Sequence, residues 1–466
     1  MEKKLINWGI IIFLLVFSSY MFFHGLGKSS LYDYDEARNS ENALEILKTG
    51  DWMIMHWGGF NEMYNLKPPF GPWMIAIGFI IFGVNEFAAR FFSALAGVGL
   101  VLTVYFLGRE LKNELVGLMA ALVLLTLRGF VAYHGAKTAD YDVLLTLFIS
   151  LSIYLFLRYQ DSKKIFYLMG SSFSIALAVF TKQAVGFFPV IIIFFYLLYS
   201  NSLKEIRWRD YLYSSLFLLI PFSWFLFRLI GDRKFFMKMI FYDLISRGTT
   251  TIEGHIGGPD FYFNVIGNNL NWLFILILVM GISLICYNSI RLKNKPFILI
   301  IWAAIIFFTF TLAQSKVIWY IIPVYPALCL IMALFLEWLR EKIKINQIIF
   351  FIVFTLVLST SLFLSLRIAN GTYRSDDKDV ANHFKPIIEK ANHLYILVNY
   401  RSQALIFYLN RVYSGNALFI DKDYKNNFSN GDILILEGNS SGVKLLVGKN
   451  FTIADKYGNY YLVAGE

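Results

Sequence analysis

Two Asp-Tyr-Asp triplets carry the carboxylates in this sequence that are best placed to do chemistry. They are Asp33-Tyr34-Asp35, which Glu36 follows, and Asp140-Tyr141-Asp142. A carboxylate whose position is fixed can deprotonate a hydroxyl or hold a divalent cation against a phosphate. One Asp-x-Asp alone would be an ordinary turn, but two in loops on one predicted face favour function. We predict that Asp35, Glu36 and Asp142 are catalytic, with Asp35 and Asp142 as the ligands of a divalent metal ion.

Six basic residues are predicted to lie near the same face. They are Lys67 within Leu-Lys-Pro-Pro, Arg38, Lys182, Lys316, Arg128 and Arg228. Each alone is as well explained by a side chain that reaches for the membrane surface or for a phospholipid headgroup. Together they would form a cationic cradle, which a reaction at a lipid-linked phosphate needs because the charge of the leaving phosphate must be stabilised.

The composition shows what kind of protein must position these residues. Of 466 residues, 57% are hydrophobic and 18% aromatic, and the mean hydropathy is +0.57, well above that of a soluble domain. The formal charge of +10 comes from short basic clusters between apolar runs, which indicate membrane orientation and not a nucleic-acid partner. Cys286 and Cys329 have no partner spacing, so neither a disulfide framework nor a cysteine zinc site is predicted.

Apolar runs predict a polytopic α-helical membrane protein with about eleven transmembrane helices. The runs are 5–24, 87–108, 115–133, 141–158, 165–181, 184–200, 211–230, 270–287, 296–313, 317–338 and 346–367. The first is long enough to span and no small-residue cleavage site follows it, so we interpret it as a span and not as a signal peptide. The run 70–83 is short and contains glycine and proline, so it is expected to be an interfacial or re-entrant helix.

The basic residues also predict the orientation. If the amino terminus is cytoplasmic, every predicted cytoplasmic loop carries at least two lysines or arginines, as the positive-inside rule requires. The first loop, 25–86, a second large loop, 231–269, and the carboxyl-terminal tail then lie outside. The predicted location is the cytoplasmic membrane.

The tail differs from the rest of the chain. It becomes polar from Thr372, opens a predicted helix at Asp376 and continues with β-rich runs separated by glycine, asparagine and serine. Roughly 95 residues suffice for one small domain. We predict a transmembrane catalytic domain over 1–369 and an extracytoplasmic α/β domain over 370–466.

An ordered series of short motifs resembles the GT-C superfamily of glycosyltransferases, in the branch of the protein O-mannosyltransferases and the aminoarabinose transferase of lipid A, ArnT. The series is Asp35-Glu36-x-Arg38, Gly50-Asp51-Trp52, Lys67-Pro68-Pro69 with Trp73, Phe82-Gly83, Phe87-Ala88-x-Arg90-Phe91, Asp142, Thr181-Lys182 before Gly186 and Pro189, Gly254-His255 with Gly258-Pro259, and Lys316 before Trp319-Tyr320, Pro323 and Tyr325-Pro326. It covers the chain to about residue 330.

The resemblance implies a polyprenyl-phosphate-linked sugar as donor, transfer on the external face and an essential acid in the first loop. By position, Asp35 would be that acid, with Glu36 and Arg38 beside it, Asp142 the second acid, and Lys67 and Lys182 the residues that hold the lipid phosphate. One departure is Leu66, where the aminoarabinose transferases have glutamate, so the resemblance does not extend to selectivity for an amino sugar or for lipid A.

These residues lead to a hypothesis for the reaction. Asp35 takes the proton of the acceptor hydroxyl as the hydroxyl attacks the anomeric carbon, which inverts that centre. Lys67, Lys182 and a divalent cation neutralise the departing phosphate. The acceptor is a lipid, a glycan or a protein. No Walker loop and no Gly-x-Gly-x-x-Gly after a strand is found to bind a nucleotide sugar, and a donor dissolved in the membrane fits better.

Four further residues are predicted to contact substrate, namely Tyr34, Asp140, His255 and Tyr320. For His255 the alternative is a plain polar contact, because a lone histidine has no ligand spacing. For Trp319 and Tyr320 the sequence favours an aromatic belt at the membrane interface over a platform that stacks on a sugar.

Two other functions compete with transfer by such an enzyme. A polysaccharide polymerase or ligase would also use lipid-linked sugars. A transporter or flippase would place charges at mid-membrane and break its helices in paired half-repeats. Here the acids collect in predicted external loops, which favours the transferase.

Overall fold

The computed structural model describes residues 2–465 except 292, 400–401, 421–428 and 439–450. Eight helical segments among these residues are long and apolar enough to cross a membrane. They are Leu5–Phe23, Glu86–Leu111, Asp142–Ser162, Ile165–Ser200, Trp208–Gly231, Trp272–Ile290, Ile318–Ile343 and Gln347–Ala369. The predicted class, a polytopic helical membrane protein, is confirmed.

The predicted number of eleven spans stays a prediction, although each predicted run overlaps a helix. Two of the runs form helices shorter than a full span, α5 (Glu114–Thr126) and α16 (Phe297–Leu312). The runs 165–181 and 184–200 form one helical segment, Ile165–Ser200. Within it α8 (Ile165–Lys182) ends at Gln183, whose backbone φ is 43°. The run 70–83 forms the 13-residue helix α3 (Phe70–Phe82).

The chain divides into two compact units. The first, which we call the membrane unit, comprises 1–24, 66–70 and 93–370. The second, which we call the loop–tail unit, comprises 25–65, 71–92 and 371–466. The predicted first external loop therefore shares a unit with the tail, except for its residues 66–70, which belong to the membrane unit.

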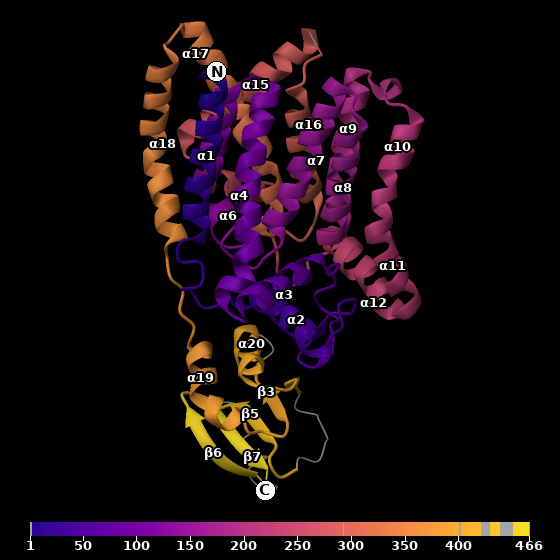
Figure 1. Ribbon diagram of the computed structural model, residues 1–466, viewed down its shortest axis with the longest axis vertical. Coiled ribbons are helices and arrows are strands. Elements are labelled where there is room, and N and C mark those ends of the chain that lie inside the picture. The colour runs from indigo at the N-terminus through magenta and orange to yellow at the C-terminus, as the bar shows by residue number, and fades with distance from the viewer. Residues whose placement is uncertain (1, 292, 400–401, 421–428, 439–450, 466) are drawn as a thin grey trace. The chain divides into compact units, whose positions relative to one another are not determined.

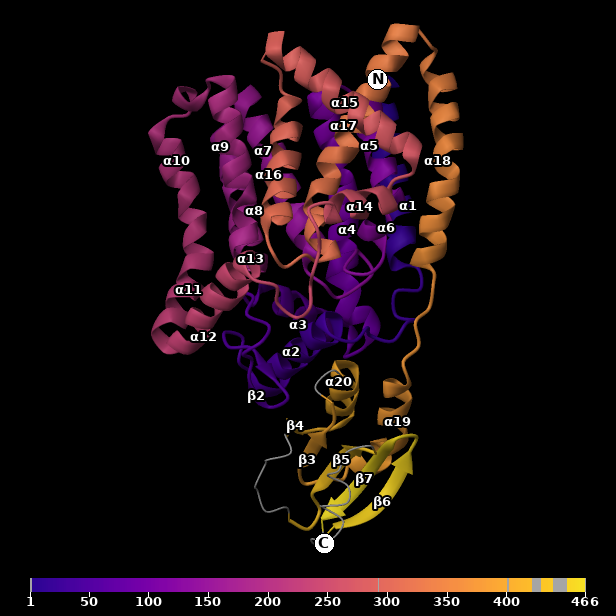
Figure 2. The same cartoon turned by 180° about the vertical axis from the view of Figure 1, so that it is seen from behind.

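Packed helices build the membrane unit (Figure 1; Figure 2). They are α1 (Glu2–Phe23), α4 (Glu86–Leu111) from residue 93 onward, α5, α6 (Arg128–Val131), α7 (Asp142–Ser162), α8, α9 (Phe188–Ser200), α10 (Trp208–Ser215), α11 (Leu219–Gly231), α12 (Arg233–Lys238), α13 (Arg247–Thr249), α14 (Phe261–Asn269), α15 (Trp272–Arg291), α16, α17 (Tyr325–Ile343) and α18 (Gln347–Ala369). Small residues let helices approach closely: a Cβ on Gly108 would meet the backbone of Gly117.

The pair α7 and α8 matters most for the site. The two helices pack along their length and are joined by a two-residue turn at Lys163, whose φ is 54°. The Ser152 and Ser171 hydroxyls lie 3.0 Å apart and tie the helices together inside the bundle. Because the pair is antiparallel, the beginning of α7 and the end of α8 come to the same end of the unit.

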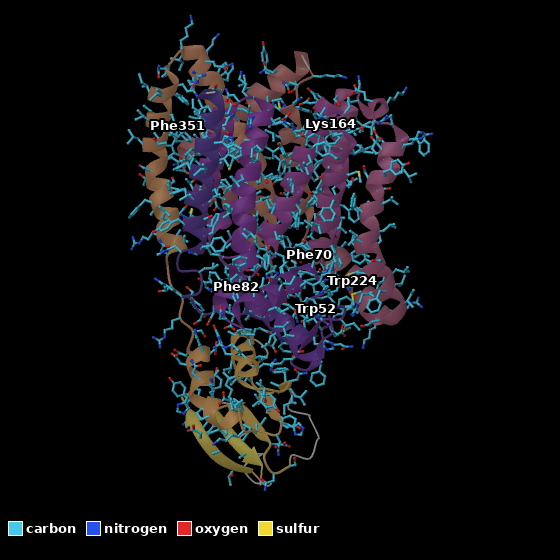
Figure 3. All side chains as sticks on the ribbon, viewed as in Figure 1. Trp52, Phe70, Phe82, Lys164, Trp224 and Phe351 are labelled. Atoms are coloured by element: carbon cyan, nitrogen blue, oxygen red, sulfur yellow. The ribbon has the colours of Figure 1, made fainter. Side chains whose placement is uncertain are left out.

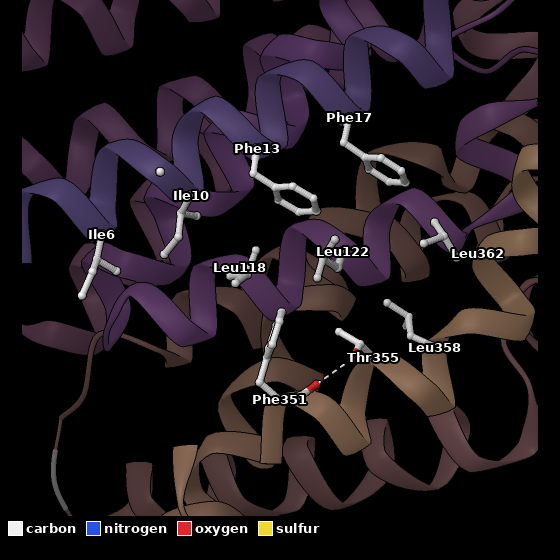
Figure 4. A pocket seen from close by; sticks show the side chains of 11 residues that line it. Ile6, Ile10, Phe13, Phe17, Leu118, Leu122, Phe351, Thr355, Leu358 and Leu362 are labelled. Atoms are coloured by element: carbon white, nitrogen blue, oxygen red, sulfur yellow. Dashed lines mark hydrogen bonds between the residues drawn. The ribbon is translucent and has the colours of Figure 1, made fainter. Parts of the chain in front are cut away.

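An apolar groove of about 460 Å³ runs between α1, α5 and α18 (Figure 4). Residues spaced by four, three and four positions form its walls, Ile6, Ile10, Phe13 and Phe17 from α1 and Phe351, Thr355, Leu358 and Leu362 from α18. Gly9 of α1 and Leu118 and Leu122 of α5 complete the lining. The Thr355 hydroxyl donates to the Phe351 carbonyl at 3.0 Å, so the one polar side chain of the lining is satisfied by its own helix.

The loop–tail unit combines α/β elements of the tail with the first loop. Its elements are α2 (Asp35–Thr49), β1 (His56–Trp57), β2 (Phe60–Asn61), α3 from residue 71, α19 (Asp376–Ile388), β3 (Leu394–Leu397), α20 (Gln403–Val412), β4 (Leu418–Phe419), β5 (Ile433–Glu437), β6 (Phe451–Tyr457) and β7 (Tyr460–Gly465). The tail strands form one sheet in the order β4-β3-β5-β7-β6, parallel around β3 and antiparallel around β7. The predicted small α/β fold of the tail is confirmed.

Helix α2 is polar yet buried, and other parts of the loop–tail unit supply hydrogen-bond partners for several of its side chains. Lys48 lies at its end, and its ammonium lies within hydrogen-bonding distance, 2.5 to 2.9 Å, of four oxygens, those of the Asn410, Tyr413 and Gly415 carbonyls and Asn410 Oδ1. Since α20 ends at Val412, this ammonium also lies at the negative end of that helix dipole. The Asn410 amide donates to Glu41 Oε1 at 2.6 Å.

The acids beside Lys48 predict a pH-dependent stability. Burial, and then repulsion by Glu45, raise the pKa of Glu41 well above its usual range, and burial raises the pKa of Glu45 to about 7. The folded state therefore keeps protons on these acids at a pH where the unfolded state has released them. The contribution of the protonated acids to the free energy of unfolding is complete at low pH and is lost as the pH rises through the pKa values of the folded state. Glutamine imitates protonated Glu41. We expect Glu41→Gln to raise the unfolding temperature relative to wild type by more at about pH 8 than at about pH 5.

Thermal unfolding of both proteins in one detergent across this pH range measures the difference. The control is Glu389→Gln, because Glu389 is exposed and pairs with Lys385 at 3.5 Å. The difference in unfolding temperature between this control and wild type should not change with pH. A difference for Glu41→Gln that is equally independent of pH would contradict the prediction.

Candidate active site

The core of the candidate site is an ion pair where α7 begins and α8 ends. The Lys182 ammonium lies 2.5 Å from Asp142 Oδ1, and both side chains are largely buried, with exposed fractions of 14% and 5%. Asp142 is the first residue of α7, where the helix dipole favours a carboxylate. The antiparallel helix pair thus joins a predicted acid to a predicted phosphate-binding lysine.

His134 adds an imidazole to this pair. Its Nδ1 lies 3.2 Å from Asp142 Oδ2 and 3.5 Å from Asp140 Oδ1, and its ring stacks on Trp319 with centroids 3.6 Å apart. Trp319, which the sequence assigned to an aromatic belt, therefore holds the imidazole in place. One imidazole and two carboxylates lie together here, and such groups can hold a metal ion.

The segment 66–70 brings Lys67 to the same place. The Lys67 ammonium lies 5.7 Å from the ring centroid of Tyr141, the residue before Asp142. The Gln183 amide donates to the Leu66 carbonyl, so the residue after Lys182 fixes the residue before Lys67. Phe70, labelled in Figure 3, packs its ring against Phe148 and Phe180 at 5.9 and 6.1 Å. The segment is thereby attached to both α7 and α8.

Tyr320 connects a third cation to the group. Its ring lies 5.3 Å from the Lys182 ammonium, and its hydroxyl accepts a hydrogen bond of 3.4 Å from Arg247. Arg247 is held by Asp243, with Nε 2.7 Å from Oδ1. Burial disfavours its charge, but Tyr320, Asp243 and Glu253 raise the pKa of the guanidinium above its usual range. We call Lys67, Lys182 and Arg247 the cationic group.

Sequence reasoning missed Arg247 and His134. Arg247 follows a π-helical turn, η4 (Met239–Ser246), in the predicted second loop, where it belongs to no motif that marks it. His134 could have been found, because it opens the short predicted loop 134–140 that also contains Asp140. Its backbone φ of 58° is a further unusual feature that only the coordinates show.

Other predicted basic residues have different surroundings. The Lys316 ammonium donates to the Thr311 and Ala313 carbonyls at 2.8 and 2.5 Å, where α16 ends, and the Lys316 amide donates to the His255 carbonyl at 3.0 Å. Arg228 is buried on α11 with Asp232 at 3.0 Å and lies 3.7 Å above the Phe235 ring. It also lies 6.0 Å from the ring of Trp224, which Figure 3 labels.

Arg128 is the exposed first residue of α6. The contacts of Lys316 and Arg228 described above are with residues other than Asp142. The predicted role of Lys316, Arg228 and Arg128 in phosphate binding stays a prediction.

The first acidic triplet lies in the loop–tail unit. Glu36 is buried, and its two oxygens lie 2.6 and 2.9 Å from the Arg90 guanidinium. Arg38 forms a forked pair with Glu62 at 2.9 and 3.3 Å and lies above the Trp57 ring. These contacts hold both side chains inside the loop–tail unit, and the predicted catalytic role of Glu36 and phosphate-binding role of Arg38 stay predictions.

Asp35 is the half-exposed first residue of α2, and the exposed Tyr34 precedes it with a φ of 68°. Because Asp35 and Asp142 belong to different units, their meeting in one cavity stays a prediction.

Comparison with known proteins shows relatives of this chain. A family model described as dolichyl-phosphate-mannose-protein mannosyltransferase matches residues 66–227, a range that contains Lys67, Asp142 and Lys182. An uncharacterized protein of Aquifex aeolicus is 30% identical over 348 residues, which are 74% of this chain and 67% of the relative.

Two further comparisons point in the same direction. An undecaprenyl phosphate-alpha-4-amino-4-deoxy-L-arabinose arabinosyl transferase of Shewanella sediminis is 26% identical over 342 residues, which are 72% of this chain and 60% of the relative, so the chain spans less than two thirds of that enzyme. The crystal structure of ArnT from Cupriavidus metallidurans bound to undecaprenyl phosphate matches with a TM-score of 0.75 at 18% identity and covers 98% of each chain. At this identity the match shows the fold.

Proposed function

Since the chain belongs to the ArnT-like branch of the GT-C glycosyltransferase superfamily, we propose that it transfers a sugar from a polyprenyl-phosphate carrier to an acceptor hydroxyl or phosphate. The relatives' names and the solved structure mention dolichyl or undecaprenyl phosphate, and polyprenyl phosphate is the chemistry these share. The sugar and the acceptor, whether lipid, glycan or protein, are left open.

One observation carries the proposal: the cationic group surrounds Tyr141 and Tyr320 beside Asp142. Lys182 contacts both Asp142 and the Tyr320 ring, Arg247 donates to Tyr320, and Lys67 lies over Tyr141. Asp142 pairs with Lys182 and Asp243 pairs with Arg247, whereas the contact described for the Lys67 ammonium is with an aromatic ring, so Lys67 is the cation of this group that best suits an additional anion. The donor would bind there as a phosphodiester with one negative charge and release a phosphate monoester dianion, and fixed cations stabilise the charge that develops on the leaving group.

The reaction then needs a base on the acceptor side. We assign this role to Asp35, which accepts the proton of the acceptor hydroxyl while the hydroxyl oxygen bonds to the anomeric carbon. The bond from that carbon to the phosphate oxygen breaks, its electrons leave with the polyprenyl phosphate, and the configuration inverts. Asp142 holds Lys182 toward the phosphate. Tyr34, Asp140, His255 and Tyr320 are the proposed substrate contacts.

A divalent cation is part of the proposal because its ligand types are present. Asp142 lies with Asp140 and His134 in the membrane unit, and this donor set suits a divalent metal. Asp142 and Asp35 are the proposed ligands, and the cation would supply positive charge beside the departing phosphate. We expect chelation by EDTA to lower the transfer rate and added Mn²⁺ or Mg²⁺ to restore it. An unchanged rate in EDTA would show that the cationic group is sufficient.

The proposed location is the cytoplasmic membrane with the amino terminus inside and the site outside. The proposed domains are a catalytic membrane domain over 1–369 and an extracytoplasmic domain over 370–466. The basic clusters of the predicted inner loops support this orientation. Cysteine labelling with a membrane-impermeant maleimide, at single cysteines introduced near Lys163 and near Asp376 in a Cys286→Ser, Cys329→Ser background, tests it. Only the second site should react from outside the cell.

Purified protein with labelled polyprenyl-phosphate sugars and candidate acceptors tests the proposed reaction. Formation of a new glycosidic bond and of free polyprenyl phosphate is the expected result. Growth of a chain by repeated units would instead indicate a polymerase, and movement of a lipid-linked sugar across a vesicle membrane without a new bond would indicate a flippase.

A further inference from the structure

Three consecutive residues of the first loop are held by the tail, all within the loop–tail unit. The Leu31 amide donates to the Tyr408 hydroxyl at 2.9 Å, the Tyr32 ring stacks on Tyr373 at 4.6 Å, and Asp33 Oδ1 accepts from the Ala404 amide at 2.9 Å. Leu31 is fully buried. The held segment ends two residues before Asp35.

Asp33 caps α20 from outside that helix. The helix begins at Gln403, and its N-cap residue, Ser402, makes no side-chain capping bond. The amide of Ala404, the second helical residue, is one of those that a helix leaves without an internal partner, and the Asp33 carboxylate accepts from it. The carboxylate also lies at the positive end of the helix dipole. The cap therefore joins two segments that are 371 residues apart.

Tyr408 lies one turn further along α20, and its hydroxyl both accepts and donates a hydrogen bond. It accepts from the Leu31 amide and donates to Glu86 Oε1 at 3.1 Å. Glu86 is itself fixed by Lys378 at 2.7 Å and Arg411 at 3.7 Å. Tyr408 is fully buried, so its hydroxyl is a rigid acceptor for the loop.

We propose that α20 positions the loop that carries the base, with Asp33 and Tyr408 as the positioning residues. This inference rests on the proposed function, because it takes Asp35 to be the base. It gives the tail a defined part in catalysis: α20 restricts the backbone before Asp35, and a restricted carboxylate loses less entropy when it meets the acceptor hydroxyl. Neither positioning residue contacts the reacting atoms.

Tyr408→Phe tests the proposal, because it removes the acceptor for the Leu31 amide and keeps the ring. We expect the turnover number to fall by about 10- to 100-fold with the donor KM unchanged, since small displacements of reacting groups have effects of this size. Hydrogen exchange of the peptide that covers Leu31 should become about tenfold faster, as expected for a lost buried hydrogen bond.

Tyr413→Phe is the matched control. The Tyr413 hydroxyl, just after the end of α20, donates to the Asn392 carbonyl at 2.7 Å, and no hydrogen bond from this hydroxyl to the described part of the first loop is found. The Tyr413 carbonyl, which accepts from Lys48, is kept in the variant. This variant loses the same kind of bond from the same part of the tail, so the turnover number and the exchange near Leu31 should stay at wild-type values. Equal effects of the two variants would overturn the proposal.

A second pair of variants covers the case in which Tyr408→Phe does not fold. Asparagine caps helices as well as aspartate does, whereas alanine does not. Asp33→Asn should therefore keep the turnover number and the exchange rate within about threefold of wild type, and Asp33→Ala should reproduce the Tyr408→Phe effects. Equal values for the two Asp33 variants would overturn the proposal. Hydrogen exchange separates this outcome from failure of the proposed function, because it reports on the loop even if Asp35 is not the base.

Discussion

Replacing Asp35 with asparagine should lower the turnover number for sugar transfer by about 10²- to 10⁴-fold, the usual contribution of a positioned general base. The amide keeps the size of the side chain and cannot accept the acceptor's proton. Since the lipid phosphate is assigned to the cationic group, the donor KM should stay within about twofold of wild type. Steady-state transfer from a labelled polyprenyl-phosphate sugar measures both constants.

Asp51→Asn is the control for this substitution. Asp51 lies in the same unit, and Oδ1 of its side chain accepts from the Met53 and Ile54 amides at 2.9 and 3.0 Å, a turn contact that asparagine also makes. The control should keep wild-type activity. Transfer by Asp35→Asn at close to the wild-type rate would exclude Asp35 as the base.

Replacing Lys182 with methionine should have the next largest effect. It removes the ammonium that lies 2.5 Å from Asp142 and over the Tyr320 ring. We expect the turnover number to fall by about 10²- to 10³-fold, comparable to the loss of one preorganised donor to a developing negative charge, and the donor KM to rise. The Asp142 carboxylate also loses its buried partner, which typically lowers the free energy of unfolding by about 3–5 kcal/mol.

A second substitution separates the lost stability from the lost chemistry. In Lys182→Met with Asp142→Asn no buried charge is left unpaired, so the unfolding temperature should recover most of its loss. The turnover number should not recover, because the cation is still missing. Lys163→Met, which breaks an exposed pair with Glu205 at 2.7 Å, should leave both quantities unchanged. Recovery of activity in the double variant would show that Lys182 serves only to neutralise Asp142.

Much of the fold and of the group around Asp142 could be predicted. Apolar runs identified the helices because a bilayer requires long uninterrupted hydrophobic segments. The motifs identified the family, which the comparisons confirm. The proximity of Asp142 and Lys182 could be predicted from the sequence. Asp142 lies at the beginning of one span and Lys182 at the end of the next, and in an antiparallel pair these two ends lie on the same side.

The partners of the first acidic triplet could not be predicted in the same way. The sequence marks Glu36 and Arg38 only as charges in a loop, and their ion pairs with Arg90 and Glu62 depend on how that loop folds back. The same is true of Arg247, which reaches Tyr320 across 73 positions of sequence. No local pattern records a contact of that kind.

By itself the sequence determined the membrane class, the family and the residue types available for binding a lipid phosphate, because hydrophobic length and short motifs are local properties of the chain. Only the tertiary structure decided which charged side chains lie together. It grouped Lys67, Lys182 and Arg247 beside Asp142, assigned Glu36 to Arg90, and attached the loop before Asp35 to α20. The physical reason is that a buried charge needs a partner, and the partner is chosen by packing between distant segments.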